Sequence, residues 1–290
     1  MSDTLPPTTR YIGASDPAEA ERLAAQDAGI LDELRVALAL HPPASDARVL
    51  ELGCGNGVYT RALLAALPCA AIVAIERDPH LLARARESLA AAIAAGRLTL
   101  LEGDAARLPF AAREFGLVTC RCLLMHQPEP LLVVSEMFRV AATGGGALAI
   151  EPDWAARALY PDAEAYAELL ALAGRARPFG FPDLLLGRKL FALFRAAGFS
   201  AVRTAATTFA EAASDQPPQD LPGTYGPIRL LEQGRALIRG AGLATDAELD
   251  TLIARLAASR RHPEYFSGGA DFVVSGVKTT PLASGEERFV

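Results

Sequence analysis

The chain has 290 residues, of which 51% are hydrophobic and 21% are charged, and its formal net charge at pH 7 is −6. A chain of this length and apolar content can bury one large α/β domain with insertions, or one domain with a small cap. The negative charge disfavours nucleic acid as the main partner. The N-terminus is polar, no apolar run approaches the length of a membrane span, and the four cysteines lack metal spacing. We therefore expect a cytoplasmic protein without a metal site.

Residues 1–47 are expected to form an N-terminal lid and helix. Asp16, Pro17 and Glu19 fit a capping box, with Asp16 as the N-cap residue and Pro17 in the first helical turn. The helix is predicted to end near Leu40, before two consecutive prolines.

A glycine-rich loop follows the first predicted strand. An apolar run ends in Glu51, and Gly53, Gly55 and Gly57 follow at alternate positions before a helical pattern begins at Val58. A strand, a glycine turn and a helix open the nucleotide-type α/β folds, because glycine permits positive φ and a close approach of ligand to backbone. The spacing differs from the Gly-x-Gly-x-x-Gly of dinucleotide sites. A carboxylate before the glycines would repel pyrophosphate and attract a cationic ligand.

A second acidic residue ends the next predicted strand. Residues 70–75 form an apolar run that ends at Glu76, one strand–helix–strand unit after Glu51. An acidic side chain at this strand end can accept both hydroxyls of a ribose. A helix is then predicted from Asp78 and Pro79 to residue 96.

The third and fourth strands are predicted at residues 98–101 and 115–121. Asp104 follows the third strand, where an acid either contacts a ligand or forms an ordinary Asx turn. The loop after the fourth strand borders the crevice in which such folds bind ligands. His126 lies in this loop and is the best candidate for a general base. The alternative is a structural histidine packed beside the loop.

The remaining segments predict the rest of the sheet and a set of insertions. We expect a core at residues 48–210 and 268–280, a helical cap insertion at 211–267, and a tail at 281–290. Within the core, residues 151–182 are rich in aromatics, which either line a substrate pocket or fill a secondary core. The elements predicted in this half are a strand at 147–151 after a turn at glycines 144–146, a helix at 182–197, a strand from residue 198, helices at 228–241 and 246–259, and a strand at 271–278.

These motifs together resemble class I S-adenosylmethionine-dependent methyltransferases of the small-molecule type. The run from residue 108 to 152 is similar to the ubiquinone/menaquinone-biosynthesis group. The resemblance implies a Rossmann-like, doubly wound α/β fold with seven strands in the order 3-2-1-4-5-7-6, the last one antiparallel. It implies S-adenosylmethionine as the cofactor and S-adenosylhomocysteine as the product. The residues that it assigns to the cofactor are Glu51, Gly53, Cys54, Gly55, Gly57, Glu76, Arg77, Asp104, Ala105 and Arg121, with Tyr11 and Gln26 from the N-terminal segment.

The sequence therefore predicts methyl transfer to a small, partly apolar acceptor by in-line displacement in a desolvated pocket. Oxygen, nitrogen and carbon remain open as the attacking atom. One alternative is a nicotinamide-dependent oxidoreductase with the same fold, and another is a protein that binds the cofactor without catalysis. The expected partner is a small molecule, and the N-terminal helix and the insertion at 211–267 could supply a homodimer contact. The acceptor stays open because its surface comes from the insertions.

Overall fold

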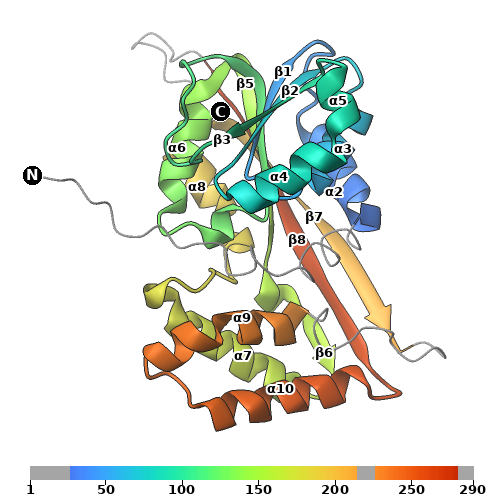
Figure 1. Cartoon of the computed structure of the whole chain (residues 1–290), viewed down its shortest axis with the longest axis vertical. Coiled ribbons are helices and arrows are strands. Elements are labelled where there is room, and N and C mark those ends of the chain that lie inside the picture. The colour runs from blue at the N-terminus through green and yellow to red at the C-terminus, as the bar shows by residue number, and fades with distance from the viewer. Residues whose placement is uncertain (1–26, 214–225, 280–290) are drawn as a thin grey trace, which may run out of the picture.

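The computed structural model describes residues 27–213 and 226–279. It consists of an α/β layer and a helical lobe, joined by the two long strands β7 (Ser200–Ala212) and β8 (Phe266–Val277) (Figure 1). The predicted capping box at Asp16 and the tail at 281–290 lie outside the described residues.

The main sheet has the strand order predicted from the sequence. Its path is β3-β2-β1-β4-β5-β8, and β7 pairs with the other edge of β8. Strands β1 to β5 are parallel, whereas β8 runs antiparallel to both β5 and β7. The short β6 is an addition, since it pairs only with residues 266–268 of β8. Without β6 the order is 3-2-1-4-5-7-6 with the last strand antiparallel, so this prediction is confirmed. The other strands are β1 (Arg48–Leu52), β2 (Ala71–Glu76), β3 (Leu98–Glu102), β4 (Phe115–Arg121), β5 (Ala141–Pro152) and β6 (Ala158–Tyr160).

Helices cover both faces of this sheet. Successive residues of a strand point to opposite faces, so Val49 packs into one core cluster and Leu50 into the other. The first cluster contains apolar residues of α2, α3 and α4, and the second contains those of α6 and α8. Both faces are apolar because both are covered. The helices are α2 (Asp27–Leu40), α3 (Val58–Ala66), α4 (Pro79–Ser88), α5 (Ala90–Ala94), α6 (Pro130–Val140) and α8 (Leu190–Ala196).

Three predicted boundaries differ from the structure. Glycines 144–146 lie inside β5. Glycine is required at two of these positions, because a Cβ at Gly145 would come within 2.7 Å of the Gly116 carbonyl oxygen and one at Gly146 within 2.6 Å of the Gly276 carbonyl oxygen. Gly145 and Gly146 permit close strand packing, and Gly144 adopts a φ of +82° with open space beside it, whereas the sequence suggested a turn over all three. The helix predicted at 78–96 is divided at Leu89 into α4 and α5. Only the second half of the helix predicted at 182–197 forms, as a short 3₁₀ turn followed by α8.

The helical lobe contains the two helices predicted in the insertion and one that precedes it. Helices α7, α9 and α10 pack on one another, and Thr245 begins α10 with a complete capping box. The aromatic side chains of residues 151–182 divide between two environments: Tyr166 and Phe181 are buried in the core, whereas Tyr160 and Phe179 are exposed. The division of the chain into a core and a cap stays a prediction. The bounds are α7 (Ala163–Ala176), α9 (Gly226–Gly240) and α10 (Asp246–Arg260).

Candidate active site

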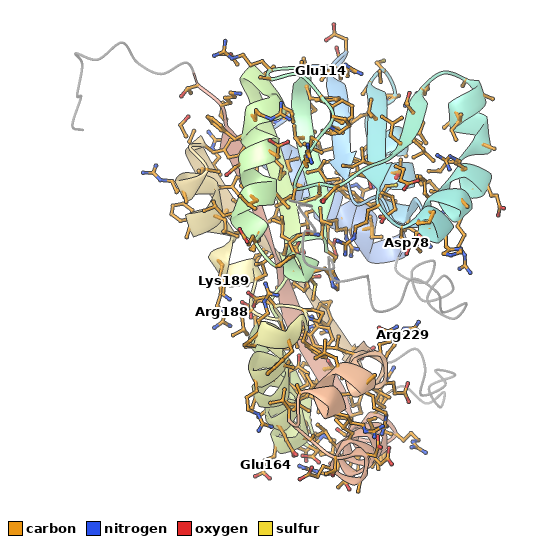
Figure 2. The ribbon with its side chains drawn as sticks, turned by 60° about the vertical axis from the view of Figure 1, so that its left-hand side comes forward. Asp78, Glu114, Glu164, Arg188, Lys189 and Arg229 are labelled. Carbon is orange, nitrogen blue, oxygen red and sulfur yellow. The ribbon has the colours of Figure 1, made fainter. Side chains whose placement is uncertain are left out.

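A cavity lies at the carboxyl ends of the parallel strands, between the sheet and the helical lobe. Glu114, just before β4, marks the opposite edge of the sheet (Figure 2). Asp78, just after β2, lies at the edge that faces the lobe, and Arg229 of α9 lies on the facing side. Folds of this type bind ligands outside the carboxyl ends of their strands. The cavity is therefore where the topology predicts a site.

The glycine loop presents its backbone to this cavity. Gly53, Gly55 and Gly57 have φ angles of +69°, +55° and +90°, in the left-handed region that glycine adopts without strain. The N–H groups of Gly53 and Cys54 donate to the Ile75 carbonyl at 2.9 and 3.0 Å, which fixes the loop to the end of β2. Gly53, Cys54 and Gly55 line the cavity, whereas Gly57 does not. No side chain caps α3 at Gly57, so the first-turn N–H groups of that helix have no side-chain partner at the cap.

Glu76 is held in the cavity wall by two backbone donors. Its side chain is buried, and its two oxygens accept the N–H groups of Gly55 and Asp78, each at 2.9 Å. Each carboxylate oxygen has a further lone pair for a ligand hydroxyl. The neighbouring Arg77 also lines the cavity. The structure thus brings the second predicted acid to the glycine loop.

Asp104 and Ala105 line the same cavity beside the end of β3. The Asp104 carboxylate oxygen Oδ1 accepts the Ala106 N–H at 2.9 Å, so the Asx turn considered from the sequence forms. The turn occupies one oxygen of the carboxylate and places the residue in the cavity wall.

Glu51, the first predicted acid, lies behind the glycine loop and does not line the cavity. Only 1% of its surface is exposed, and neither carboxylate oxygen forms a hydrogen bond with a described residue. Burial raises the pKa of Glu51 to about 8, so the carboxyl group is neutral at pH 7. A neutral group neither repels pyrophosphate nor attracts a cationic ligand, so the charge of Glu51 does not support the choice of ligand that was made from the sequence.

Arg121, at the end of β4, lines the cavity and forms an ion pair with a residue of α2. Its Nε and Nη2 atoms donate to the two carboxylate oxygens of Glu33 at 2.5 and 3.2 Å, and both side chains are largely buried. The sequence analysis missed Glu33. The signal was an acid on the buried stripe of an amphipathic helix, three positions after Ile30 and one before Leu34, both of which are buried.

The loop after β4 is positioned by Glu151, which the sequence analysis also missed as a site residue. This side chain is fully buried at the end of β5 and accepts the N–H groups of Leu123 and Leu124 at 2.8 and 2.6 Å. Cys122 enters the loop with a φ angle of +50°. The 3₁₀ turn that follows, Leu124–His126, places His126 in the cavity wall.

The far half of the cavity comes from residues 151–182 and from the insertion at 211–267, both considered for the acceptor surface in the sequence analysis, and from β8. Its walls combine apolar side chains with several polar ones, as in pockets that bind and orient a small molecule. These lining residues are Pro152, Trp154, Arg157, Pro182, Gly226, Arg229, Leu230, Gln233 and Asp271. Tyr11 and Gln26, predicted to contact the cofactor, lie outside the described residues.

The strand order, the glycine loop and the acids that follow β2 and β3 agree with the resemblance to class I S-adenosylmethionine-dependent methyltransferases. Residues 49–145 match the family described as "Methyltransferase domain". The matched range covers the glycine loop and the acids at the ends of β2 and β3, in line with the family predicted from the sequence. The match disfavours the oxidoreductase alternative.

Three curated relatives match part of the chain. The 2-methyl-6-phytyl-1,4-hydroquinone methyltransferase 2 of Oryza sativa subsp. japonica is 30% identical over 151 residues, which cover 49% of this chain and 40% of the relative. A ribosomal RNA small subunit methyltransferase A of Haloarcula marismortui is 38% identical, with 34% and 38% covered. The demethylmenaquinone methyltransferase of Lactiplantibacillus plantarum is 31% identical, with 37% and 46% covered. The chain spans less than half the length of each.

Solved structures with the same fold cover most of the chain. BH2331 of Bacillus halodurans C-125, assigned to the methyltransferases, matches with a TM-score of 0.56 at 19% identity, over 87% of this chain and all of its own. A phosphoethanolamine N-methyltransferase 2 of Haemonchus contortus, solved with phosphomonomethylethanolamine and S-adenosylhomocysteine, matches with a TM-score of 0.55 at 15% identity, over 94% and 61%. At these identities the likeness establishes the fold. Within residues 27–213 and 226–279, no helix is long and apolar enough to cross a membrane.

Proposed function

We propose that the chain transfers a methyl group from S-adenosylmethionine to a small, partly apolar acceptor. The observation that carries this proposal is the position of Glu76, whose carboxylate is fixed beside the glycine loop in the wall of one cavity with Asp104. The family match over residues 49–145 supports the same cofactor.

The residues around the glycine loop fit this cofactor. Glu76 keeps lone pairs for the two ribose hydroxyls, and the cavity wall at Asp104 and Ala105 suits the adenine ring. The loop backbone and the N-terminus of α3 suit the carboxylate of the methionine part. In this proposal Arg77 and Arg121 complete the cofactor side. Glu51 lies behind the loop and outside the cavity wall.

The bound cofactor would supply a methyl group on a positively charged sulfur, which a nucleophile displaces in line. The chain contributes walls that exclude water, including Leu123, Met125 and Trp154. It also contributes the fixed loop after β4, which aligns the acceptor with the methyl group. In this proposal His126 removes a proton from the acceptor when the acceptor arrives protonated.

The acceptor is proposed to be a small molecule because the helical lobe covers the far half of the cavity. Residues 226, 229, 230 and 233 of α9 line this half together with Trp154 and Pro182. Two of the three relatives are named for hydroquinone or menaquinone acceptors, and the third is named for ribosomal RNA. A concave site that a helix partly covers favours a small ring compound over a polymer. The absence of a nucleic-acid role stays a prediction, as does a homodimer.

The test has two stages. Isothermal titration of the purified chain with S-adenosylhomocysteine and with NAD is expected to give heat only with the former. A screen that detects released S-adenosylhomocysteine, with phenols, quinols and amines as acceptors, is then expected to give turnover with at least one ring compound. Binding of NAD instead would refute the cofactor assignment. If S-adenosylhomocysteine binds but none of the acceptors causes its release from S-adenosylmethionine, the non-catalytic alternative would be favoured.

A further inference from the structure

We propose that Arg157 and Asp271 together bind a neutral hydroxyl group of the acceptor and so determine its specificity. This inference rests on the proposed function, because the two residues line the acceptor half of the same cavity. Neither residue belongs to the motifs that hold the cofactor.

Arg157 is held rigidly in the cavity wall. Its guanidinium carbon lies 4.7 Å from the ring centre of Trp154 and 4.9 Å from that of Phe209. The stem of the side chain crosses β8 at Gly269, where an added Cβ would lie 2.6 Å from the Arg157 Cγ atom. A guanidinium fixed between two rings loses little conformational entropy when it binds a ligand.

The Nε donor of Arg157 is not used within the described part of the chain. This atom is buried and donates no hydrogen bond to a described residue. Among the residues that the structure describes, no carboxylate forms an ion pair with this side chain. A buried donor without an acceptor is costly, and the guanidinium that carries it lines the cavity, where its other N–H groups can meet a ligand oxygen.

Asp271 supplies an acceptor in the same wall. It lies on β8 opposite Pro152, at the carboxyl end of β5, and its Oδ1 atom is buried without a hydrogen bond to a described residue. Glu33 of α2 faces it, together with Arg121 of β4 and Arg157. Burial and the Glu33 charge raise the pKa of Asp271, and the two arginines oppose this rise. Arg121 is already paired with Glu33, so the Asp271 carboxyl group, which lines the cavity, has no ion pair with Arg121.

A hydroxyl group satisfies both residues with one atom, since it donates to Asp271 and accepts from Arg157. A methyl ether has no proton for Asp271. A carboxylate has no proton to donate to Asp271, and an ammonium group has no lone pair to accept from Arg157, so each satisfies only one of the two residues. The face of Trp154 beside Arg157 and the apolar side chain of Leu230 suit the ring that carries the hydroxyl.

The experiment compares three naphthalene probes that differ in one group. With S-adenosylhomocysteine bound to the wild-type chain, 2-naphthol is expected to bind about 10- to 100-fold more tightly than 2-methoxynaphthalene, as measured by calorimetry. 2-Naphthoate is expected to bind weakly as well. Equal affinity for naphthol and its ether, a preference for the naphthoate, or no naphthol binding at all would overturn the inference.

Two variants test the residues directly. Asp271→Asn and Arg157→Gln are each expected to remove the preference for 2-naphthol over its ether, while the affinity for S-adenosylhomocysteine stays unchanged. The matched controls are Asp46→Asn, at the amino edge of the sheet, and Arg175→Gln, on the exposed face of α7, and both should keep the preference.

The outcomes separate the two proposals. Variants that discriminate as well as the wild type would overturn the inference and leave the proposed cofactor in place. If S-adenosylhomocysteine itself does not bind the wild-type chain, the proposed function fails and the inference fails with it. The comparison of the three probes on the wild-type chain needs no variant. The inference can therefore be refuted even if neither variant folds.

Discussion

The role proposed for Glu76 predicts a specific loss of cofactor affinity in Glu76→Gln. The two oxygens of Glu76 accept the N–H groups of Gly55 and Asp78 at 2.9 Å each. The amide keeps one acceptor and turns an NH₂ group toward the other donor, so one hydrogen bond is lost and the glycine loop shifts. The amide also carries no charge, so its hydrogen bonds to the ribose hydroxyls of the cofactor are expected to be weaker. Hydrogen bonds to charged groups contribute about 1.5–3 kcal/mol, against about 0.5–1.5 kcal/mol for neutral ones.

These terms together predict a loss of about 2–3 kcal/mol, which corresponds to about 30- to 150-fold weaker binding of S-adenosylhomocysteine. The assay is isothermal titration calorimetry at pH 7.5. Glu102→Gln is a matched control, because Glu102 ends β3 and pairs with Glu76 in the sheet but is exposed and outside the cavity wall. Unchanged affinity in Glu76→Gln, or an equal loss in Glu102→Gln, would refute the reasoning.

Three further predictions concern catalysis, the glycine loop and pH. His126→Ala should lower turnover by about 10²- to 10⁴-fold while cofactor affinity stays the same, and a variant with wild-type turnover would remove His126 from the mechanism. Gly57→Ala should destabilise the fold by about 1–3 kcal/mol, because φ is +90° and the new Cβ would lie 2.7 Å from the Leu89 Cδ1 atom. Thermal unfolding should show a smaller loss for Gly96→Ala, whose φ is also positive but whose Cβ would meet open space. Because the pKa of Glu51 is raised to about 8 in the folded chain, the unfolded chain loses its proton first as pH rises, and stability should fall between about pH 4.5 and 8. Chemical denaturation of Glu51→Gln should show a shallower fall over this range, and an identical pH profile would contradict the assignment.

The parallel part of the sheet was predictable because each signal is local in the sequence. An apolar run that ends in an acid fixes the ends of β1 and β2 within one or two residues, and the carboxyl ends of parallel strands meet at one edge. The strand pattern therefore placed Glu76 and Asp104 at one edge of the sheet, and the family resemblance assigned both to a common site. Glu51 shows the limit of this reasoning, since the pattern fixes its position on the strand but not whether it faces the cavity.

The segments of the acceptor half were considered from the sequence, but the individual residues could not be predicted because they meet only through long-range packing. Arg157 and Asp271 are separated by most of the helical lobe in sequence, and they reach one cavity wall because β8 returns beside β5. Glu33 and Arg121 are also far apart in the sequence, and they meet because α2 packs against the sheet. Glycines 144–146 were misread because a glycine run that suits a turn also suits strands that approach closely.

The continuity of β8 limits how the cavity can open. The strand pairs with β5 through residues 271–277 and with β6 through residues 266–268, and β7 accompanies it on the other edge along both stretches. Bending this ribbon at residues 269–270 would break the ladder with β7, which continues across the junction. Ligands are therefore expected to enter and leave by displacement of α9, which closes the cavity without belonging to the sheet, and exchange rates should respond to changes in that helix more than to changes in β7 or β8.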